Sequence, residues 1–141
     1  SVVLAGSPAD GVTVFYGQGD KSGTTAHNGT DMWTAGVKYA AGAVTVGIQQ
    51  SAVDETAADS DIDRTHIAAS FAVNENLSVS YGISTVEFEA NTKVDEVSSG
   101  FAASYTMGSM TLAAFRNNVD DEAGVSSAED TTTEISLAFA F

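Results

Sequence analysis

Carboxylate side chains are the residues of this sequence most suited to chemistry, because they gather in two stretches, around residues 54–63 and 120–130. Hard oxygen ligands of this kind suit Ca²⁺ or Mg²⁺. The spacing of Asp59, Asp61 and Asp63 matches the first positions of a calcium-binding loop, but the glycine at the sixth place and the glutamate at the twelfth are missing. We therefore expect loose, diffuse binding of Ca²⁺ or Mg²⁺ in place of a discrete metal site, with acidic loops that hold no ion as the alternative. The residues concerned are Asp59, Asp61, Asp63, Asp120, Asp121 and Glu122.

Catalytic patterns are weak in this chain. His27 and His66 are the two histidines, and serine is so frequent that its proximity to His66 carries no information about a hydrolase. The Gly17-Gln18-Gly19 triplet is not followed by the further glycine and helix of a nucleotide-binding fingerprint. We expect no enzymatic activity and no required cofactor.

Composition narrows the class of protein. The 141 residues suffice for one domain, and we expect residues 1–141 to form a single segment. Five basic against 19 acidic residues give a formal net charge of -14, which argues against nucleic acid as a partner. No apolar run approaches the roughly 20 residues of a membrane-spanning helix. If the protein meets a membrane, it does so with strands.

Apolar residues alternate along the chain with the two-residue period of β-strands. In residues 33–40, Trp33, Ala35, Val37 and Tyr39 oppose smaller or polar neighbours. The same period predicts strands at 44–49, 66–73, 77–84, 100–107 and 134–141, weaker ones at 12–18 and 110–117, and the end of a further strand at 1–6.

The connections between these strands alternate strictly between short and long. Residues 6–11, 40–43, 73–76 and 107–109 are short, whereas 19–31, 52–63, 87–96 and 118–132 are long. The long connections hold most of the acidic residues, and only Glu134 lies inside an expected strand. One end of the sheet should therefore be rich in carboxylates.

The character of the two strand faces favours a membrane barrel. A soluble sandwich would bury its apolar face and show charged residues to water on the other. Here the second face carries Gly, Ala, Ser and Thr, which suit the wall of a closed barrel whose apolar side meets lipid. Residues of shared parity are expected to face lipid, namely Trp33, Val37, Tyr39, Val46, Ile67, Phe71, Val79 and Leu137. Trp33 and Tyr39 would be separated by roughly 15 Å along the membrane normal, at about 3.3 Å per residue and a tilt near 40°.

The C-terminal sequence TTTEISLAFAF (131–141) ends in phenylalanine and completes an alternating strand. It resembles the C-terminal assembly signal of Gram-negative outer-membrane barrels, which would be carried by Ile135, Leu137, Phe139 and Phe141. The hairpins FAASYTMGSMTLAAF (101–115) and WTAGVKYAAGAVTVGIQ (33–49) resemble the C-terminal half of a general diffusion porin of the alphaproteobacterial type. The resemblance covers nearly the whole chain.

This resemblance implies an all-β, antiparallel up-and-down transmembrane β-barrel, of which this chain would be a segment of about nine strands out of about 16. It implies a homotrimer in the outer membrane of a Gram-negative bacterium, in contact with membrane lipid and lipopolysaccharide. The implied function is passive diffusion of small hydrophilic solutes and ions through a water-filled channel. The family's inward-folded third loop and its acidic constriction residues have no counterpart in this sequence.

Residues on the small-residue parity would line such a channel, and they are Lys38, Gln49, Arg64, His66 and Glu134. Arg64 best matches the basic wall that sets a transverse field in the family, with an ion pair to Asp61 or Asp63 as the alternative. Arg116 shares the parity of Met110, Leu112 and Ala114 and would point outward near the long connections, where it could contact lipopolysaccharide phosphates unless a bulge reverses its side.

Strand direction predicts further strands. If Phe141 ends on the short-turn side, the strand that ends at Gly6 also runs toward that side, and nine strands is an odd number for a bacterial single-chain barrel. We therefore expect residues 2–5 and 135–141 to be open edges that pair with strands outside this chain. The alternatives are a complete eight-stranded barrel that serves as an adhesin or anchor, and a soluble acidic β-sandwich that serves as a binding module.

Overall fold

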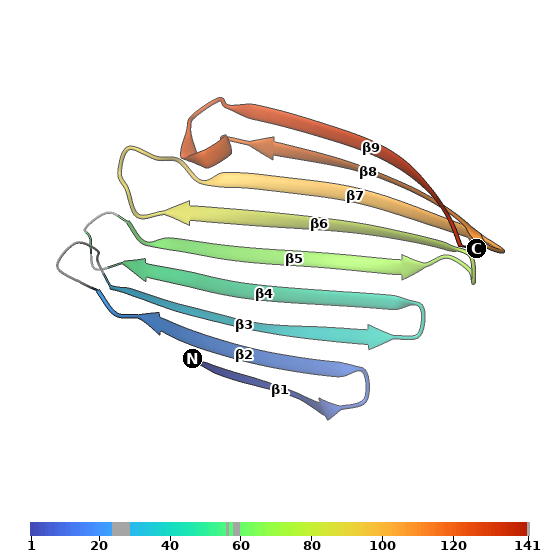
Figure 1. Ribbon diagram of the computed structural model, residues 1–141, viewed down its shortest axis with the longest axis horizontal. Helices are drawn as coiled ribbons and strands as arrows, with labels where there is room; N and C mark the ends of the chain where they lie inside the picture. The colour runs from blue at the N-terminus through green and yellow to red at the C-terminus, as the bar shows by residue number, and fades with distance from the viewer. Residues whose placement is uncertain (24–28, 56, 58–59, 141) are drawn as a thin grey trace.

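The chain forms a single antiparallel sheet in which every strand pairs with its neighbours in sequence (Figure 1). A computed structural model describes residues 1–23, 29–55, 57 and 60–140. The strands are β1 (Val2–Ala9), β2 (Val12–Lys21), β3 (Thr30–Ala41), β4 (Val44–Glu55), β5 (Ile62–Ala72), β6 (Leu77–Phe88), β7 (Glu96–Met107), β8 (Met110–Asp120) and β9 (Glu129–Phe139), with a short 3-10 helix, η1 (Glu122–Gly124), between the last two. The predicted all-β, up-and-down architecture is confirmed.

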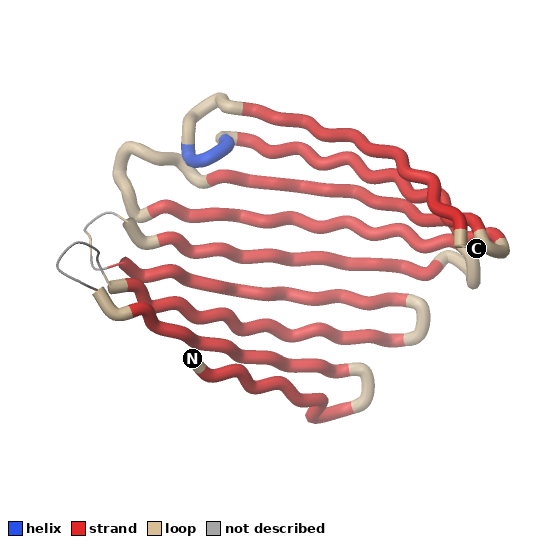
Figure 2. The backbone as a smooth tube through the Cα atoms, viewed as in Figure 1, coloured by secondary structure: helices blue, strands red, loops and turns tan. Residues whose placement is uncertain are grey.

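Short and long connections lie at opposite ends of the sheet, as the sequence predicts (Figures 1 and 2). Two of the short turns begin with a glycine at positive φ, Gly42 at 58° and Gly108 at 60°. This backbone conformation suits the two-residue turns that join twisted antiparallel strands. In the connection after β5, Asn74 Oδ1 accepts hydrogen bonds from the backbone N–H groups of Asn76 and Leu77, both at 2.9 Å.

The strands extend further than the sequence predicts, mainly toward the long connections. β2 ends at Lys21 and β3 begins at Thr30, whereas we expected a connection over 19–31. The assignment of Glu134 as the one acidic strand residue is therefore wrong. Backbone pairing continues past the apolar part of each strand, so that carboxylates occupy strand ends. These residues are Asp20, Asp31, Asp54, Glu55, Asp63, Glu87, Glu96, Asp120, Glu129 and Asp130.

The sheet has two contrasting faces and no second layer among the described residues. We call the face that bears Val37 the apolar face and the face that bears Lys38 the small-residue face. Directly opposed pairs such as Val37 with Ile48 and Phe71 with Val79 continue the apolar face across the strands. In the described part of the chain, Ala52 and Val86 are the buried hydrophobic residues, at 4% and 7% exposure. Large apolar side chains stay uncovered instead, with Ile67 at 55% and Leu137 at 54%.

β1 and β9 are the two edges of the sheet, and no pairing joins them in the described residues. The register is continuous in seven of the strand pairs and shifts between Gly6 and Ala9 in the pairing of β1 with β2. β1 runs toward the short turns and β9 ends there, as expected from strand counting (Figure 1). Within the described residues, no helix is long and apolar enough to cross a membrane.

Candidate channel wall

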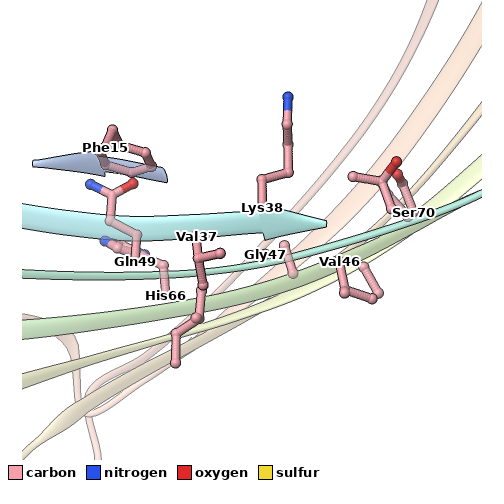
Figure 3. Close-up of a pocket in the computed structure, with 13 residues that line it drawn as sticks. Phe15, Val37, Lys38, Val46, Gly47, Gln49, His66 and Ser70 are labelled. Carbon is pink, nitrogen blue, oxygen red and sulfur yellow. The ribbon is translucent and has the colours of Figure 1, made fainter. Parts of the chain in front are cut away.

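The register places all five predicted channel-lining residues on the small-residue face. Gln49 lies directly opposite His66, and Lys38 lies opposite Gly47. Arg64 pairs with Ser51, and Glu134 pairs with Phe115. In Figure 3, Lys38, Gln49, Phe15 and Ser70 lie on one side of the strands, and Val46 lies on the other. The shared face follows from the ladders, whereas contact of these residues with a channel lumen stays a prediction.

A polar group on β3 to β5 holds Gln49 in place. Gln49 Nε2 donates a hydrogen bond of 3.1 Å to Thr34 Oγ1, and Thr34 Oγ1 donates one of 3.2 Å to the carbonyl oxygen of Gln50. Because Thr34 is anchored on the backbone, the Gln49 amide has a fixed direction along the wall. His66 lies beside it with an exposed side chain.

Lys38 and Arg64 are exposed cations on this wall. Among the described residues neither makes an ion pair, and Asp63 lies on the opposite face because its strand neighbour Arg64 points the other way. The alternative that Arg64 is tied up by Asp61 or Asp63 is therefore not observed. Both cations are available to solute or solvent.

The wall is hollowed beside Lys38. Gly47, Ala68 and Gly82 are opposed across β4, β5 and β6, so this row carries almost no side-chain volume. An open depression of about 300 Å³ is lined there by Lys38, Gly47, Gln49, His66 and Ser70, among other residues (Figure 3). A wall of this shape leaves room for water next to charged and hydrogen-bonding groups.

Phe15 is a wall residue that the sequence interpretation missed. It faces Gly36 across β2 and β3 and lines the same depression. Its position between Val14 and Tyr16, on a weakly patterned strand, did carry a signal, because it puts an aromatic ring on the parity of the small residues.

Glu134 is not brought near the cations by this sheet. It lies on β9, whereas Lys38 and Arg64 lie on β3 and β5, with several strands between them. Any electrostatic relation between Glu134 and the cations would therefore act at a distance, not through contact.

In the described parts of the long connections, carboxylate-to-backbone hydrogen bonds tie the backbone together and form a rim. Asp61 Oδ1 accepts from the Glu55 N–H at 2.8 Å, and Glu96 Oε2 accepts from the Ala123 N–H at 2.8 Å. The Glu89 N–H donates to the Asp61 carbonyl at 3.0 Å, which ties neighbouring connections together. These acids were expected to bind divalent ions loosely or to hold no ion, and their role as acceptors of structural hydrogen bonds was not predicted.

The β8–β9 connection packs against the β6–β7 connection around Gly124. Gly124 is buried at φ 74°, and its carbonyl accepts from the Val94 N–H at 3.2 Å. A Cβ at Gly124 would lie 2.9 Å from Lys93 Cβ and 3.0 Å from Phe88 Cδ2. Lys93 Nζ lies 4.2 Å from the centroid of the Phe88 ring, a cation–π arrangement. This corner of the rim is compact.

The described residues contain no discrete metal site. In the ranges that the structure describes, no three His, Cys, Asp or Glu side chains form a group that could hold a metal ion, and Asp59 lies outside those ranges. Asp61 and Asp121 accept backbone hydrogen bonds, the latter from the Ser127 N–H at 2.6 Å. Diffuse binding by Asp61, Asp63, Asp120, Asp121 and Glu122 stays a prediction.

The apolar face contains the eight residues predicted to contact lipid. The ladders place Trp33, Val37, Tyr39, Val46, Ile67, Phe71, Val79 and Leu137 together on it. Of the predicted assembly signal, Ile135, Leu137 and Phe139 lie on the same face, and Phe141 lies outside the described residues. Their contacts with lipid and with insertion machinery stay predictions.

The residue types on the apolar face change from apolar to polar at a consistent distance from the short turns. Roughly six to eight positions from the short-turn end, polar residues replace apolar ones in most strands, and they form a belt of Gln18, Gln50, Thr65, Thr85, Ser99, Arg116 and Thr133. Beyond the belt the face carries carboxylates: Asp20, Asp31, Asp54, Asp63, Glu87, Asp120 and Glu129. At about 3.3 Å per residue and a tilt near 40°, the apolar band is roughly 15–20 Å tall.

Comparisons with known proteins agree with this two-faced sheet. A family model described as Gram-negative porin matches residues 5–115. An outer membrane protein of Vibrio cholerae, OmpT folded in vitro, has a similar structure with a TM-score of 0.66 at 18% sequence identity, and the match covers 99% of this chain and 54% of that chain. The chain therefore spans about half the length of that solved protein. A search of curated proteins found no match. Because the family model covers most of the sequence, this chain belongs to the Gram-negative porin family of outer-membrane proteins.

Proposed function

We propose that this sheet forms part of the wall of a water-filled channel that passes small hydrophilic solutes and ions by passive diffusion, without enzymatic activity. The observation that carries the proposal is the contrast between the two faces. The apolar face leaves large apolar side chains uncovered on all strands of the sheet. The small-residue face combines the depression beside Lys38 with the polar residues Gln49, Arg64 and His66. Uncovered apolar surface of this extent fits a lipid environment, and a polar interior fits a water-filled lumen.

The two alternatives receive less support. A soluble sandwich needs a second sheet to cover the apolar face, and the described residues form one sheet. A complete eight-stranded barrel needs its first and last strands to pair, whereas β1 and β9 are edges with no pairing between them in the described part of the chain.

We infer that the barrel closes with strands additional to these nine. Backbone N–H and C=O groups at an open edge have no partners in hydrocarbon, so β1 and β9 each need a neighbouring strand. The solved neighbour, of which this chain spans about half, supplies a precedent for a longer chain. The test is the intact mass of the native protein, which we expect to be at least about twice the 14.4 kDa of these residues. A mass near 14.4 kDa would support closure by several copies of this chain. The trimeric assembly that the family resemblance implies remains a prediction.

The experiment for channel function uses the native protein, reconstituted into planar lipid bilayers and into liposomes. We expect stepwise, ohmic conductance, and entry of small sugars that falls as the sugar becomes larger. A Lys38→Glu variant should change ion preference, because it reverses a charge beside the hollowed floor. Folded, inserted protein that passes neither ions nor sugars would reject the proposal.

A further inference from the structure

Arg116, on β8, differs from its neighbours because it carries a positive charge on the apolar face. On the apolar face of the described strands it is the one cationic side chain, since Lys21, Lys38 and Arg64 lie on the other face. The ladders on both sides of it are continuous and pair it with Phe101 and Thr133, so no bulge turns it inward. Its side chain is exposed, and it makes no ion pair with any of the described residues.

The absence of an ion pair is informative because the chain carries 19 acidic residues. On the apolar face of β8 and β9, the acidic residues nearest to Arg116 are the opposed pair Asp120 and Glu129. This pair lies four residues further along the two strands. At about 3.3 Å per residue this corresponds to roughly 13 Å, which exceeds the Debye length of about 10 Å at 0.1 M salt. Arg116 therefore faces outward as an uncompensated positive charge.

Further hydrogen-bond donors lie next to it on the same face. Thr133 is directly opposite Arg116, and Asn118 is two residues along β8. Asn118 Oδ1 accepts a hydrogen bond of 3.0 Å from Thr131 Oγ1, which directs the carbonyl side of the amide toward β9. Within the described residues, neither the Asn118 amide nitrogen nor the Thr133 hydroxyl has a partner, so both remain available as donors.

Apolar surface adjoins this polar group on the side of the short turns. Phe101 is 52% exposed, Leu112 43% and Ile135 72%, and all three lie on the apolar face at or below the level of Arg116. A ligand for this site therefore needs an anionic head with several hydrogen-bond acceptors and an attached hydrocarbon part. If the apolar face meets lipid, as proposed above, the belt lies where headgroups meet hydrocarbon, and the long connections place it on the outer side of the membrane.

We propose that Arg116, with Asn118 and Thr133, binds the phosphate of a phosphorylated lipid in the outer leaflet, while acyl chains cover Phe101 and Leu112. A guanidinium group and a phosphate form two parallel, charge-assisted hydrogen bonds, which favours a phosphate over a neutral headgroup. The carboxylates beyond the belt repel phosphate and confine it to the level of Arg116. This inference rests on the outward orientation of the apolar face, and it does not depend on which solutes the channel passes.

The test measures dissociation constants of the native protein for lipid A by native mass spectrometry in neutral detergent, with EDTA present to remove bridging divalent ions. We expect Arg116→Gln to weaken lipid A binding about fivefold, the factor that corresponds to about 1 kcal/mol for one cationic side chain near an anionic lipid surface. Arg116→Lys should retain most of the affinity. Dephosphorylated lipid A should bind wild type and Arg116→Gln equally.

Arg64→Gln is the matched control, because it removes the same charge from the opposite face. We expect it to leave lipid A binding unchanged, with far-UV circular dichroism confirming that each variant is folded. Equal affinity of wild type and Arg116→Gln, or equal weakening by Arg64→Gln, would overturn the proposal. Competition by inorganic phosphate as strong as that of lipid A would show a free-anion site and reject the lipid. If the native protein binds lipid A as expected but conducts no ions, the channel function is rejected and the lipid site is retained.

Discussion

The ring of Phe15 lies across the backbone of Gly36 on the small-residue face. A Cβ built at Gly36 would approach Phe15 Cε1 to 2.6 Å and the Ile48 carbonyl oxygen to 2.9 Å, distances that real Cβ atoms do not show. An aromatic ring packed over a cross-strand glycine shields the backbone and fixes the register of both strands. Phe15 can therefore occupy this position only because Gly36 has no side chain.

Gly36→Ala should lower the free energy of unfolding by about 1–3 kcal/mol, because the added methyl group forces the ring or the strand to move. The control is Gly82→Ala, where the nearest atoms to the new Cβ are 3.5 Å away, an ordinary contact distance. Urea unfolding of the vesicle-inserted protein measures both. In a Phe15→Ala background, Gly36→Ala should be milder. Equal stability of the two alanine variants would contradict the packing described here.

Val46 and Gly47 are consecutive residues on opposite faces of β4, which makes them a matched pair for testing the face assignment. Val46→Arg should cost about 1–3 kcal/mol in folding into a bilayer, because a cation on the lipid side costs most at the middle of the membrane and less toward its edge, and Val46 lies between the two. Gly47→Arg should cost much less, because a Cβ there is 3.5 Å from its nearest atom and the side chain enters the hollowed wall. Comparable destabilisation by both substitutions would show that the faces are assigned wrongly.

Period-two alternation was enough to predict the order of the strands, the alternation of connection lengths and the face of each predicted wall residue. In Trp33, Val37 and Tyr39 the apolar side chains define a face directly, and the pairing partners follow in register. Strand ends were missed because backbone pairing at Asp31 or Asp120 continues where the hydrophobic signal has stopped. The hydrogen bonds that the carboxylates of Asp61 and Glu96 accept depend on loop geometry that no local pattern encodes. The parity of Phe15 signalled its face, but its packing on Gly36 could not be predicted because it joins residues that are distant in sequence.

Gly124→Ala should loosen the β8–β9 connection. Alanine at φ 74° is strained, and its Cβ would also press on Lys93 and Phe88, which hold the connection against its neighbour. Limited proteolysis of the folded protein should then cleave within residues 121–128, where we expect the wild type to resist. Gly108→Ala is the control, since that residue has a similar φ of 60° but open space around its Cβ. Resistance of Gly124→Ala equal to that of Gly108→Ala would show that the packing contributes nothing.

Asp20, Asp31 and Asp54 lie directly opposite one another on three adjacent strands and share the apolar face. Like charges in directly opposed positions destabilise a sheet. We expect Asp31→Asn, at the middle of the row, to raise the free energy of unfolding by about 0.2–1 kcal/mol in EDTA, the range for cross-strand pairs. Added Mg²⁺ should stabilise wild type more than the variant if divalent ions gather there diffusely. Asp95→Asn, outside the strands, should change neither value, and a destabilising Asp31→Asn would show that the carboxylate is needed.

At low salt we expect the reconstituted channel to prefer cations. The rim concentrates carboxylates such as Asp61, Glu89 and Glu96, while Lys38 and Arg64 are exposed cations on the wall below. Negative charge at a mouth raises the local concentration of cations and so favours their entry. Because the Debye length falls from about 30 Å at 0.01 M to about 3 Å at 1 M, the preference should fade in concentrated KCl. Reversal potentials across a KCl gradient measure it. Arg64→Gln should strengthen cation preference at every salt concentration, since it removes a repelling charge from the wall itself. Anion preference in dilute KCl would instead show that Lys38 and Arg64 dominate the lumen.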